Sequence, residues 1–317
     1  VDSMTASNST NGRSVREAPW FIRTSFALGG RLLPGLAERQ AARLFLTPRV
    51  RKGLTPTELH AELLPERAMQ RHAGEHEAAY PEIATGRIAL WSWGRGPAVL
   101  LVHGWSGSAA DMAPIGAELV RAGYRAVMFD MPGHGESAAR PTNLFVYLRT
   151  LEALASIVGP LDGIVGHSLG GSATALALGG GLVQAKRAAL VAPALSPWAF
   201  AWHFADIIGL PAARVPGMVA RTEQLVGAKA DSLNAAEAVA SLQTPGYLVH
   251  DPEDLDVPFE HSTGIAAAWP GATLVARPGL GHRRILKDPE TLAGIRRFLT
   301  RPAPLTRPAV PDRIAAR

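Results

Sequence analysis

The feature that most restricts the fold is a glycine-rich turn around Ser168. The residues Gly166 to Gly171 have the sequence GHSLGG, and they follow an apolar segment ending at Ile164–Val165 and precede a helical pattern over residues 172–178. So sharp a turn needs glycines, because side chains at those positions would clash. A strand–turn–helix elbow of this kind exposes the hydroxyl of its central serine. The pattern therefore predicts an α/β fold with a nucleophilic serine at residue 168.

Apolar runs and helical patterns alternate between residues 87 and 300. This alternation predicts a mostly parallel sheet with helices on both faces. The run Ala98–Val102 is apolar throughout, which is typical of a strand that is buried on both sides. We expect strands at residues 87–93, 98–102, 124–129, 164–165, 188–191, 247–249 and 273–276, and helices at residues 111–122, 144–158, 172–178 and 288–299.

The interval from residue 194 to residue 244 interrupts this alternation. It contains aromatic and aliphatic residues at helical spacings, including Trp198, Phe204 and Met218. Since the interval is too long for an ordinary loop, we expect a small helical cap over one edge of the sheet.

The two ends of the chain differ from its middle in charge. The net charge is +5, but residues 1–60 carry +5, residues 296–317 carry +5, and the residues between them carry −5. A strongly basic protein suggests a nucleic-acid partner, but the central part of this chain is acidic. We therefore expect no nucleic-acid partner, and a chemical site within the acidic middle.

The domain organisation follows from these patterns. Residues 1–17 are expected to form a disordered tail, in which residues 1–3 precede a native start at Met4. Residues 18–86 are expected to form an N-terminal helical extension, with an amphipathic helix over residues 36–46. Residues 87–300 would form the α/β domain that contains Ser168, with the cap as an insertion over about residues 194–244, and residues 301–317 would form a basic C-terminal tail.

The basic N-terminal extension has two possible roles. It could contact an anionic membrane, or it could pack on the central domain with its arginines in solvent, and we favour the second because its apolar residues are few. No apolar run reaches 18 residues, so no membrane-spanning helix is expected. A cytoplasmic location is the default expectation, and the oligomeric state is left open.

A serine hydroxyl needs a base and an acid that orients the base. Asp254 follows the expected strand at residues 247–249, and His282 follows the one at residues 273–276. Loops after the carboxyl ends of parallel strands gather at one edge of the sheet. The order serine, acid, histidine is that of elbow-type hydrolases. Asp256 is the second candidate for the acid, since only geometry separates the two carboxylates.

The chain resembles the α/β-hydrolase family over roughly residues 87–300. Besides the Ser168 elbow, His103-Gly104-Trp105 looks like the family's oxyanion turn, and residues 130–137 (DMPGHGES) look like its D-x-P-G-x-G-x-S loop. One residue departs from the pattern, because Asp251 stands where the family commonly has glycine. The resemblance implies an α/β-hydrolase fold with a helical cap.

The resemblance also implies a mechanism. Ser168 would attack an acyl carbonyl, His282 would transfer the proton, and Asp254 would orient His282. The backbone N–H groups of Trp105 and Leu169 would bind the oxyanion. The chain has no cysteine, so the nucleophile must be an oxygen.

These residues predict a serine hydrolase that cleaves carboxylic esters, small-molecule substrates with small to medium apolar acyl groups, through an acyl-enzyme intermediate. Thioesterase, lactonase, amidase and acyltransferase activities use the same triad and stay open. A non-catalytic binding protein with this fold is a lesser alternative. The histidines form no pattern typical of a metal site, so neither a metal nor a cofactor is expected.

Overall fold

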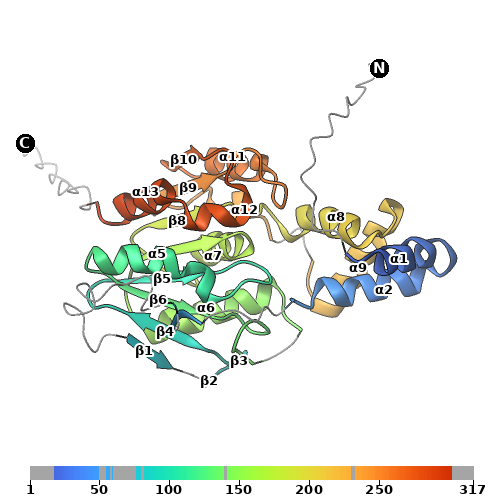
Figure 1. Ribbon diagram of the computed structural model, residues 1–317, viewed down its shortest axis with the longest axis horizontal. Coiled ribbons are helices and arrows are strands. Elements are labelled where there is room, and N and C mark those ends of the chain that lie inside the picture. Colours follow the sequence, from blue (N-terminus) through green and yellow to red (C-terminus); the bar gives the residue numbers. More distant parts are fainter. Residues whose placement is uncertain are drawn as a thin grey trace, which may run out of the picture.

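The protein is built around an eight-stranded sheet (Figure 1). The structure, a computed structural model, describes residues 18–49, 55–57, 59, 76–79, 82–138, 141–229 and 233–301. The strand order is β1-β4-β6-β5-β7-β8-β9-β10. The six strands from β6 to β10 in this order run parallel, and β4 and β1 add an antiparallel edge. The predicted mostly parallel sheet is therefore confirmed. The strands, including the separate pair β2–β3, are β1 (His76–Ala79), β2 (Glu82–Ile83), β3 (Gly86–Arg87), β4 (Leu90–Trp93), β5 (Ala98–Val102), β6 (Arg125–Phe129), β7 (Leu161–His167), β8 (Ala188–Val191), β9 (Gly246–His250) and β10 (Thr273–Ala276).

Helices cover both faces of this sheet. One face packs against α6, α7, α10 and α11, and the other packs against α5 and α13. The remaining helices are α1, α2, α8 and α9, which lie together to one side of the sheet in Figure 1, and the short α12. The helix bounds are α1 (Trp20–Leu32), α2 (Pro34–Phe45), α5 (Ala109–Arg121), α6 (Leu144–Val158), α7 (Leu169–Gly179), α8 (Pro197–Ile208), α9 (Val215–Val226), α10 (Ala235–Val239), α11 (Phe259–Ala268), α12 (Gly281–Arg284) and α13 (Pro289–Leu299).

The central strand β5 shows how the sheet builds two cores. All five of its residues are buried, as its unbroken apolar run predicts. Leu100 and Val102 face one hydrophobic cluster, and Val99 and Leu101 face the other. Successive side chains of a strand point to opposite faces, so one short apolar run supports both helical layers.

The sheet begins earlier in the chain than expected. Strand β1 pairs with β4 and lies upstream of the predicted domain boundary at residue 87. The single strand predicted over residues 87–93 is also divided, into β3 and β4. The division lies at Ala89, whose N–H donates to Ser137 Oγ at 2.8 Å and not to the neighbouring strand, although its carbonyl still accepts from the Asp130 N–H at 2.9 Å in the register of β4 with β6.

The predicted helical cap is present, but it is shorter than residues 194–244. It consists of α8 and α9, whereas α10 packs on α7 and α11 of the central domain. Val239 and Ala235 of α10 are buried in the main hydrophobic core. Because α10 has an apolar pattern similar to that of the cap helices, the sequence did not show that α10 belongs to the central domain.

Within the predicted N-terminal extension, helices α1 and α2 pack on this cap, whereas β1 joins the central sheet through β4. Helix α2 lies against α9, and α1 lies against both α2 and α8. Their shared core includes the small residues Ala37, Ala41, Ala42, Ala201 and Ala205. An ion pair crosses the same contact, with Glu38 3.4 Å from Arg221. We call the four helices α1, α2, α8 and α9 the cap layer.

The two predicted tails, residues 1–17 and residues 301–317, lie outside the described residues apart from Arg301. Within the described ranges, no helix has the length and apolar character needed to cross a bilayer.

Candidate active site

Ser168 stands at a strained turn between β7 and α7. Its backbone has φ 54° and ψ −122°, in a region that side chains rarely adopt. The glycines around it permit the close approach of backbone segments. A Cβ atom at Gly166 would lie 2.5 Å from the carbonyl oxygen of Gly170, and one at Gly170 would lie 2.4 Å from the carbonyl oxygen of His103. The predicted elbow is therefore present, with Ser168 at its apex.

These contacts predict that Gly170→Ala destabilises the protein strongly. The added Cβ would meet backbone oxygens of His103 and Val102, which cannot move without shifting β5, so we expect a loss of about 3 kcal/mol or more of unfolding free energy. The measurement is thermal and urea unfolding. Gly264→Ala in α11 is the matched control, because no heavy atom lies within 4 Å of its Cβ position. It should stabilise by about 0.5–1 kcal/mol, and equal effects of the two substitutions would contradict the prediction.

The acid and the base meet beyond the ends of β9 and β10. Asp254 lies in the loop after β9, and His282 lies in α12, which follows β10. The Nδ1 atom of His282 is 2.7 Å from Oδ2 of Asp254. Asp256 makes no hydrogen bond to His282 among the described residues, and it donates its backbone N–H to Asp254 Oδ1 at 2.8 Å. The geometry therefore favours Asp254 over Asp256 as the acid partner of His282.

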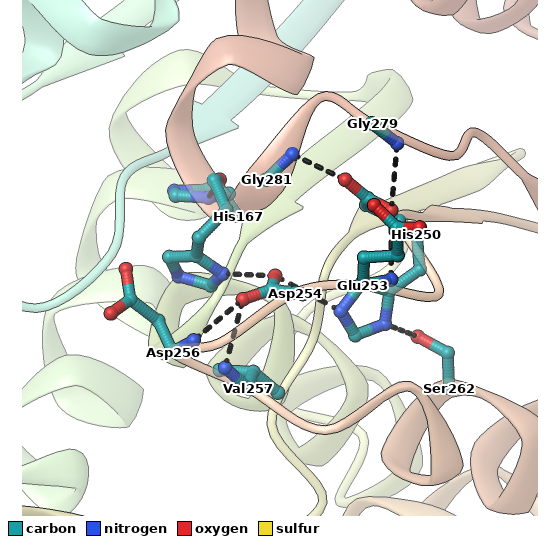
Figure 2. A network of polar contacts seen from close by, with 11 residues as sticks. His167, His250, Glu253, Asp254, Asp256, Val257, Ser262, Gly279 and Gly281 are labelled. Carbon is teal, nitrogen blue, oxygen red and sulfur yellow. Dashed lines mark hydrogen bonds and ion pairs between the residues drawn. The ribbon is translucent and has the colours of Figure 1, made fainter. Parts of the chain in front are cut away.

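Asp254 lies at the centre of a wider hydrogen-bond network, shown in Figure 2. The buried His250 has its Nε2 atom 3.1 Å from Asp254 Oδ2 and its Nδ1 atom 2.7 Å from Ser262 Oγ. The backbone N–H of Val257 donates to Oδ1 at 3.0 Å. Each carboxylate oxygen of Asp254 thus has two hydrogen-bond partners, and its orientation is fixed from four directions.

This network sets the charge of Asp254. Burial alone would raise the pKa of its carboxyl group, but the hydrogen bonds from His250 and His282, the charge of His282 and the Val257 N–H together hold the pKa well below its usual value. Asp254 is therefore ionised at neutral pH and can stabilise a positive charge on His282.

His250 and Asp251 belong to the hydrogen-bond network of the candidate site, which sequence reasoning missed. Asp251, the departure from the family pattern, is buried and accepts hydrogen bonds from the backbone N–H groups of Glu253 at 2.8 Å, Gly279 at 3.2 Å and Gly281. Gly281 directly precedes His282, and Figure 2 shows both glycine N–H groups pointing into this network. The carboxylate of Asp251 thus holds the loop of the histidine against the loop of the acid. The unusual residue at position 251 was the available signal.

The two predicted oxyanion donors lie on either side of Ser168. Leu169 is the first residue of α7, and Trp105 follows the turn at Gly104, where a Cβ atom would lie only 2.8 Å from Ser168 Cβ. Neither backbone N–H donates a hydrogen bond to any described residue. Both groups are therefore available to a developing negative charge, and that of Leu169 has the additional field of a helix N-terminus.

The histidines near the elbow hydrogen-bond to the backbone of the neighbouring loops. The Met131 N–H donates to His103 Nε2 at 2.9 Å, which leaves His103 Nδ1–H to donate to the Gly104 carbonyl at 2.8 Å. Burial lowers the pKa of His103, so the ring is neutral. His167 stacks on His282 with ring centroids 4.7 Å apart, and its Nε2 lies 2.9 Å from the His282 carbonyl oxygen. Burial and the nearby His282 lower the pKa of His167 well below its usual value.

The loop of residues 130–137 (DMPGHGES) is hydrogen-bonded to the predicted oxyanion turn and to the residue that follows it. Asp130 accepts hydrogen bonds from the backbone N–H groups of Ala109 at 2.7 Å and Glu136 at 2.8 Å. The Ser106 N–H, next to Trp105, donates to His134 Nε2 at 3.1 Å. Asp130 and His134 of this motif thus fix the backbone of the surrounding loops.

One group of possible metal ligands exists among the described residues. Asp254, Asp256 and His282 each offer an atom within 4.8 Å of the others. Both oxygens of Asp254 and the Nδ1 atom of His282 are already engaged in the hydrogen bonds described above. A metal ion here would have to replace these bonds, so the residues fit a proton-transfer pair better than a metal site.

A cavity of about 830 Å³ connects this site with the cap layer. Ser168, Leu169, Trp105 and His282 are among its lining residues, and His282 connects it to Asp254 through the hydrogen bond described above. Its other walls are mostly apolar and come from both chain segments of the cap layer, including Ile22, Phe45, Trp198, Phe200, Phe204 and Ile207. The elbow, the His282–Asp254 pair and the two backbone donors thus meet at one apolar cavity.

Comparison with known proteins places this arrangement in a family. Residues 99–295 match the model of the alpha/beta hydrolase family. An uncharacterized protein of Mycobacterium tuberculosis is 31% identical over 227 residues, which cover 68% of this chain and 73% of that protein. A pimeloyl-[acyl-carrier protein] methyl ester esterase of Xylella fastidiosa is 36% identical over 78 residues, 25% of this chain and 29% of that enzyme. An esterase of Pyrococcus furiosus has a similar structure, with a TM-score of 0.61 at 18% identity, over 80% of this chain and 96% of the esterase. The chain belongs to the alpha/beta hydrolase family.

Proposed function

We propose that the protein is a serine hydrolase that cleaves carboxylic esters with apolar acyl groups. The observation that carries the proposal is the 2.7 Å contact between Asp254 and His282 at the cavity that Ser168 lines. Serine, histidine and aspartate in this order form the triad of elbow-type hydrolases. The conformation of Ser168 supports the same function, since a strained backbone at a half-buried serine that lines a cavity is costly without a role.

The reaction would proceed in two halves. His282 removes the proton of Ser168 as the hydroxyl oxygen attacks the acyl carbonyl, and the N–H groups of Leu169 and Trp105 bind the resulting oxyanion. His282 then gives the proton to the departing alkoxide, which leaves an acyl-serine ester. Water repeats the sequence, with His282 again as the base, and releases the acid and free Ser168. Asp254 stays ionised throughout and stabilises the protonated His282.

The cavity supports an apolar acyl group of medium length. Its volume of about 830 Å³ lies within the range of pockets that enclose a small organic ligand, and aromatic side chains of α8 cover it. The esterase from Xylella fastidiosa is named for a methyl ester of an acyl chain on a carrier protein. That name favours an oxygen ester over the thioester, lactone and amide substrates that the triad also permits.

The proposal is tested with p-nitrophenyl esters of increasing acyl length, from acetate through butyrate to dodecanoate. We expect hydrolysis with the highest kcat/KM at a medium chain length, because each buried CH₂ adds about 0.8 kcal/mol until the cavity is filled. A fluorophosphonate probe should label the folded protein, and peptide mass spectrometry should locate the label on Ser168. Labelling without turnover of any ester would redirect the proposal toward thioesters or amides. A folded protein without labelling would refute a nucleophilic serine and favour a binding protein.

A further inference from the structure

Helices α1 and α2 present an apolar surface to solvent. Seven of the eleven exposed large hydrophobic side chains in the described part of the chain lie between residues 20 and 44. Trp20 and Leu32 are 78% and 76% exposed, values that are unusual for such side chains. We call this surface the outer face of α1–α2. Its apolar members are Trp20, Phe21, Leu28, Leu32, Leu33 and Leu36, whereas Leu44 also lines the cavity.

The exposed residues of α1 recur at helical spacing. They occur at positions 20–21, 24–25, 28 and 31–32, so they form one continuous stripe along the helix. The opposite side of α1, which includes Ile22 and Phe26, packs into the cap layer or lines the cavity. Helix α1 therefore has two apolar sides, of which packing within the protein uses only one.

The outer face is also positively charged. Arg31, Arg39 and Arg43 are exposed and have no ion-pair partner among the described residues. The single acidic residue between positions 18 and 49 is Glu38, which turns inward to Arg221 and Arg214. Apolar side chains and unpaired arginines thus share a surface on which α1 and α2 place no exposed carboxylate.

We propose that the outer face of α1–α2 binds the surface of an anionic lipid bilayer. An amphipathic helix with arginines beside tryptophan, phenylalanine and leucine binds such surfaces through apolar insertion and attraction to lipid phosphates. A second copy of this chain fits less well, because a symmetric contact through this face would bring unpaired arginines together. Packing of the extension on the protein and binding to a membrane were stated above as alternatives. They are compatible, because they use opposite sides of α1.

The same two helices connect this surface with the site. Ile22 of α1 and Leu44 and Phe45 of α2 line the cavity that reaches Ser168. A helix is about 10 Å thick, so a bilayer on the outer face would lie one helix away from the cavity. Surface binding does not depend on the proposed ester hydrolysis, and the two can be tested separately.

The test is sedimentation of the full chain with phosphatidylcholine vesicles, with and without an equal part of phosphatidylserine. We expect binding to the mixed vesicles and at least about tenfold weaker binding to phosphatidylcholine alone. The variant Arg31→Gln/Arg39→Gln/Arg43→Gln should lower the partition coefficient about a hundredfold, because each arginine near an anionic surface contributes roughly fivefold. The variant Leu28→Ser/Leu32→Ser should weaken binding without changing its dependence on phosphatidylserine.

Matched controls lie on α6, where Ile157 is 53% exposed and Arg149 is an exposed arginine. Ile157→Ser and Arg149→Gln should leave vesicle binding unchanged, and circular dichroism with a thermal melt in vesicle-free buffer should report that each variant is folded. Equal binding to both vesicle types, or equal loss in the α6 variants, would overturn the proposal. So would a dimer in sedimentation velocity that Leu28→Ser/Leu32→Ser converts to monomer, because the face would then be a protein interface.

Discussion

Ser168→Ala should lower kcat/KM for p-nitrophenyl butyrate by about 10⁴-fold or more, because removing the nucleophile of a serine triad removes the acyl-enzyme route entirely. The residual rate would come from the oxyanion donors and from substrate binding alone. The variant should unfold at the same temperature as the wild type or higher. The substitution removes only the hydroxyl oxygen, so few packing contacts are lost, and the strained backbone at residue 168 is unchanged. The measurement combines initial rates with a thermal melt of the same preparation.

Ser156→Ala is the control for this loss. Ser156 is exposed on α6, and its hydroxyl donates to the Glu152 carbonyl oxygen within the same helix. We expect its activity to lie within a factor of two of the wild type, as is usual for a surface substitution far from the site. Full activity in Ser168→Ala would remove the serine mechanism, even if the protein proved to be an esterase.

Asp254→Asn should lower kcat by about 10⁴-fold, the loss that follows when a triad aspartate becomes an amide and the histidine takes the wrong tautomer. Asp256→Asn is the matched control, because Asp256 acts on the network through its backbone N–H, which asparagine retains. Its activity should change by less than about tenfold. The reverse ranking of the two variants would transfer the acid role to Asp256.

The pH dependence of the unfolding free energy offers a second comparison, between the wild type and Asp254→Asn. In the folded state the pKa of Asp254 is held well below its usual value, while the unfolded chain has a pKa of about 3.9 for aspartate. The native state therefore binds fewer protons than the unfolded state, and the resulting stability is fully present above about pH 4 and is lost as the pH falls through the folded pKa. The difference in unfolding free energy between wild type and Asp254→Asn should thus be largest near neutral pH and shrink below about pH 4.

Local patterns were enough to predict the sheet and the elbow. The run Ala98–Val102 and the alternation around it predicted β5 with its bounds, and the glycines at 166 and 170 indicated the turn whose contacts they permit. Parallel strands bring their carboxyl-end loops to one edge, so Asp254 and His282 could be expected near Ser168 from their order in the chain. The geometry agrees with this expectation, while their catalytic roles are the subject of the experiments above.

Long-range partnerships could not be predicted in the same way. The amphipathic pattern of α2 indicated a buried side but not that α9 covers it, because helical periodicity describes one helix at a time. His250 and Asp251 belong to a run of mostly polar residues, and their burial could not be predicted from that pattern. What distinguishes them is the backbone N–H groups of Gly279 and Gly281 and the hydroxyl of Ser262, which other segments supply.

The contact between α2 and α9 also has a consequence for the order in which the protein can assemble. Glu38 and Arg221 are 183 positions apart, so a ribosome that adds about 5–20 residues per second completes α9 on the order of ten to forty seconds after α2. During that interval α1 and α2 can pack on each other, but they lack α8 and α9, which later complete the cap layer. Helices α1 and α2 therefore reach their final packing only when the middle of the chain arrives, and the wall of the cavity that they share with α8 is completed at the same time.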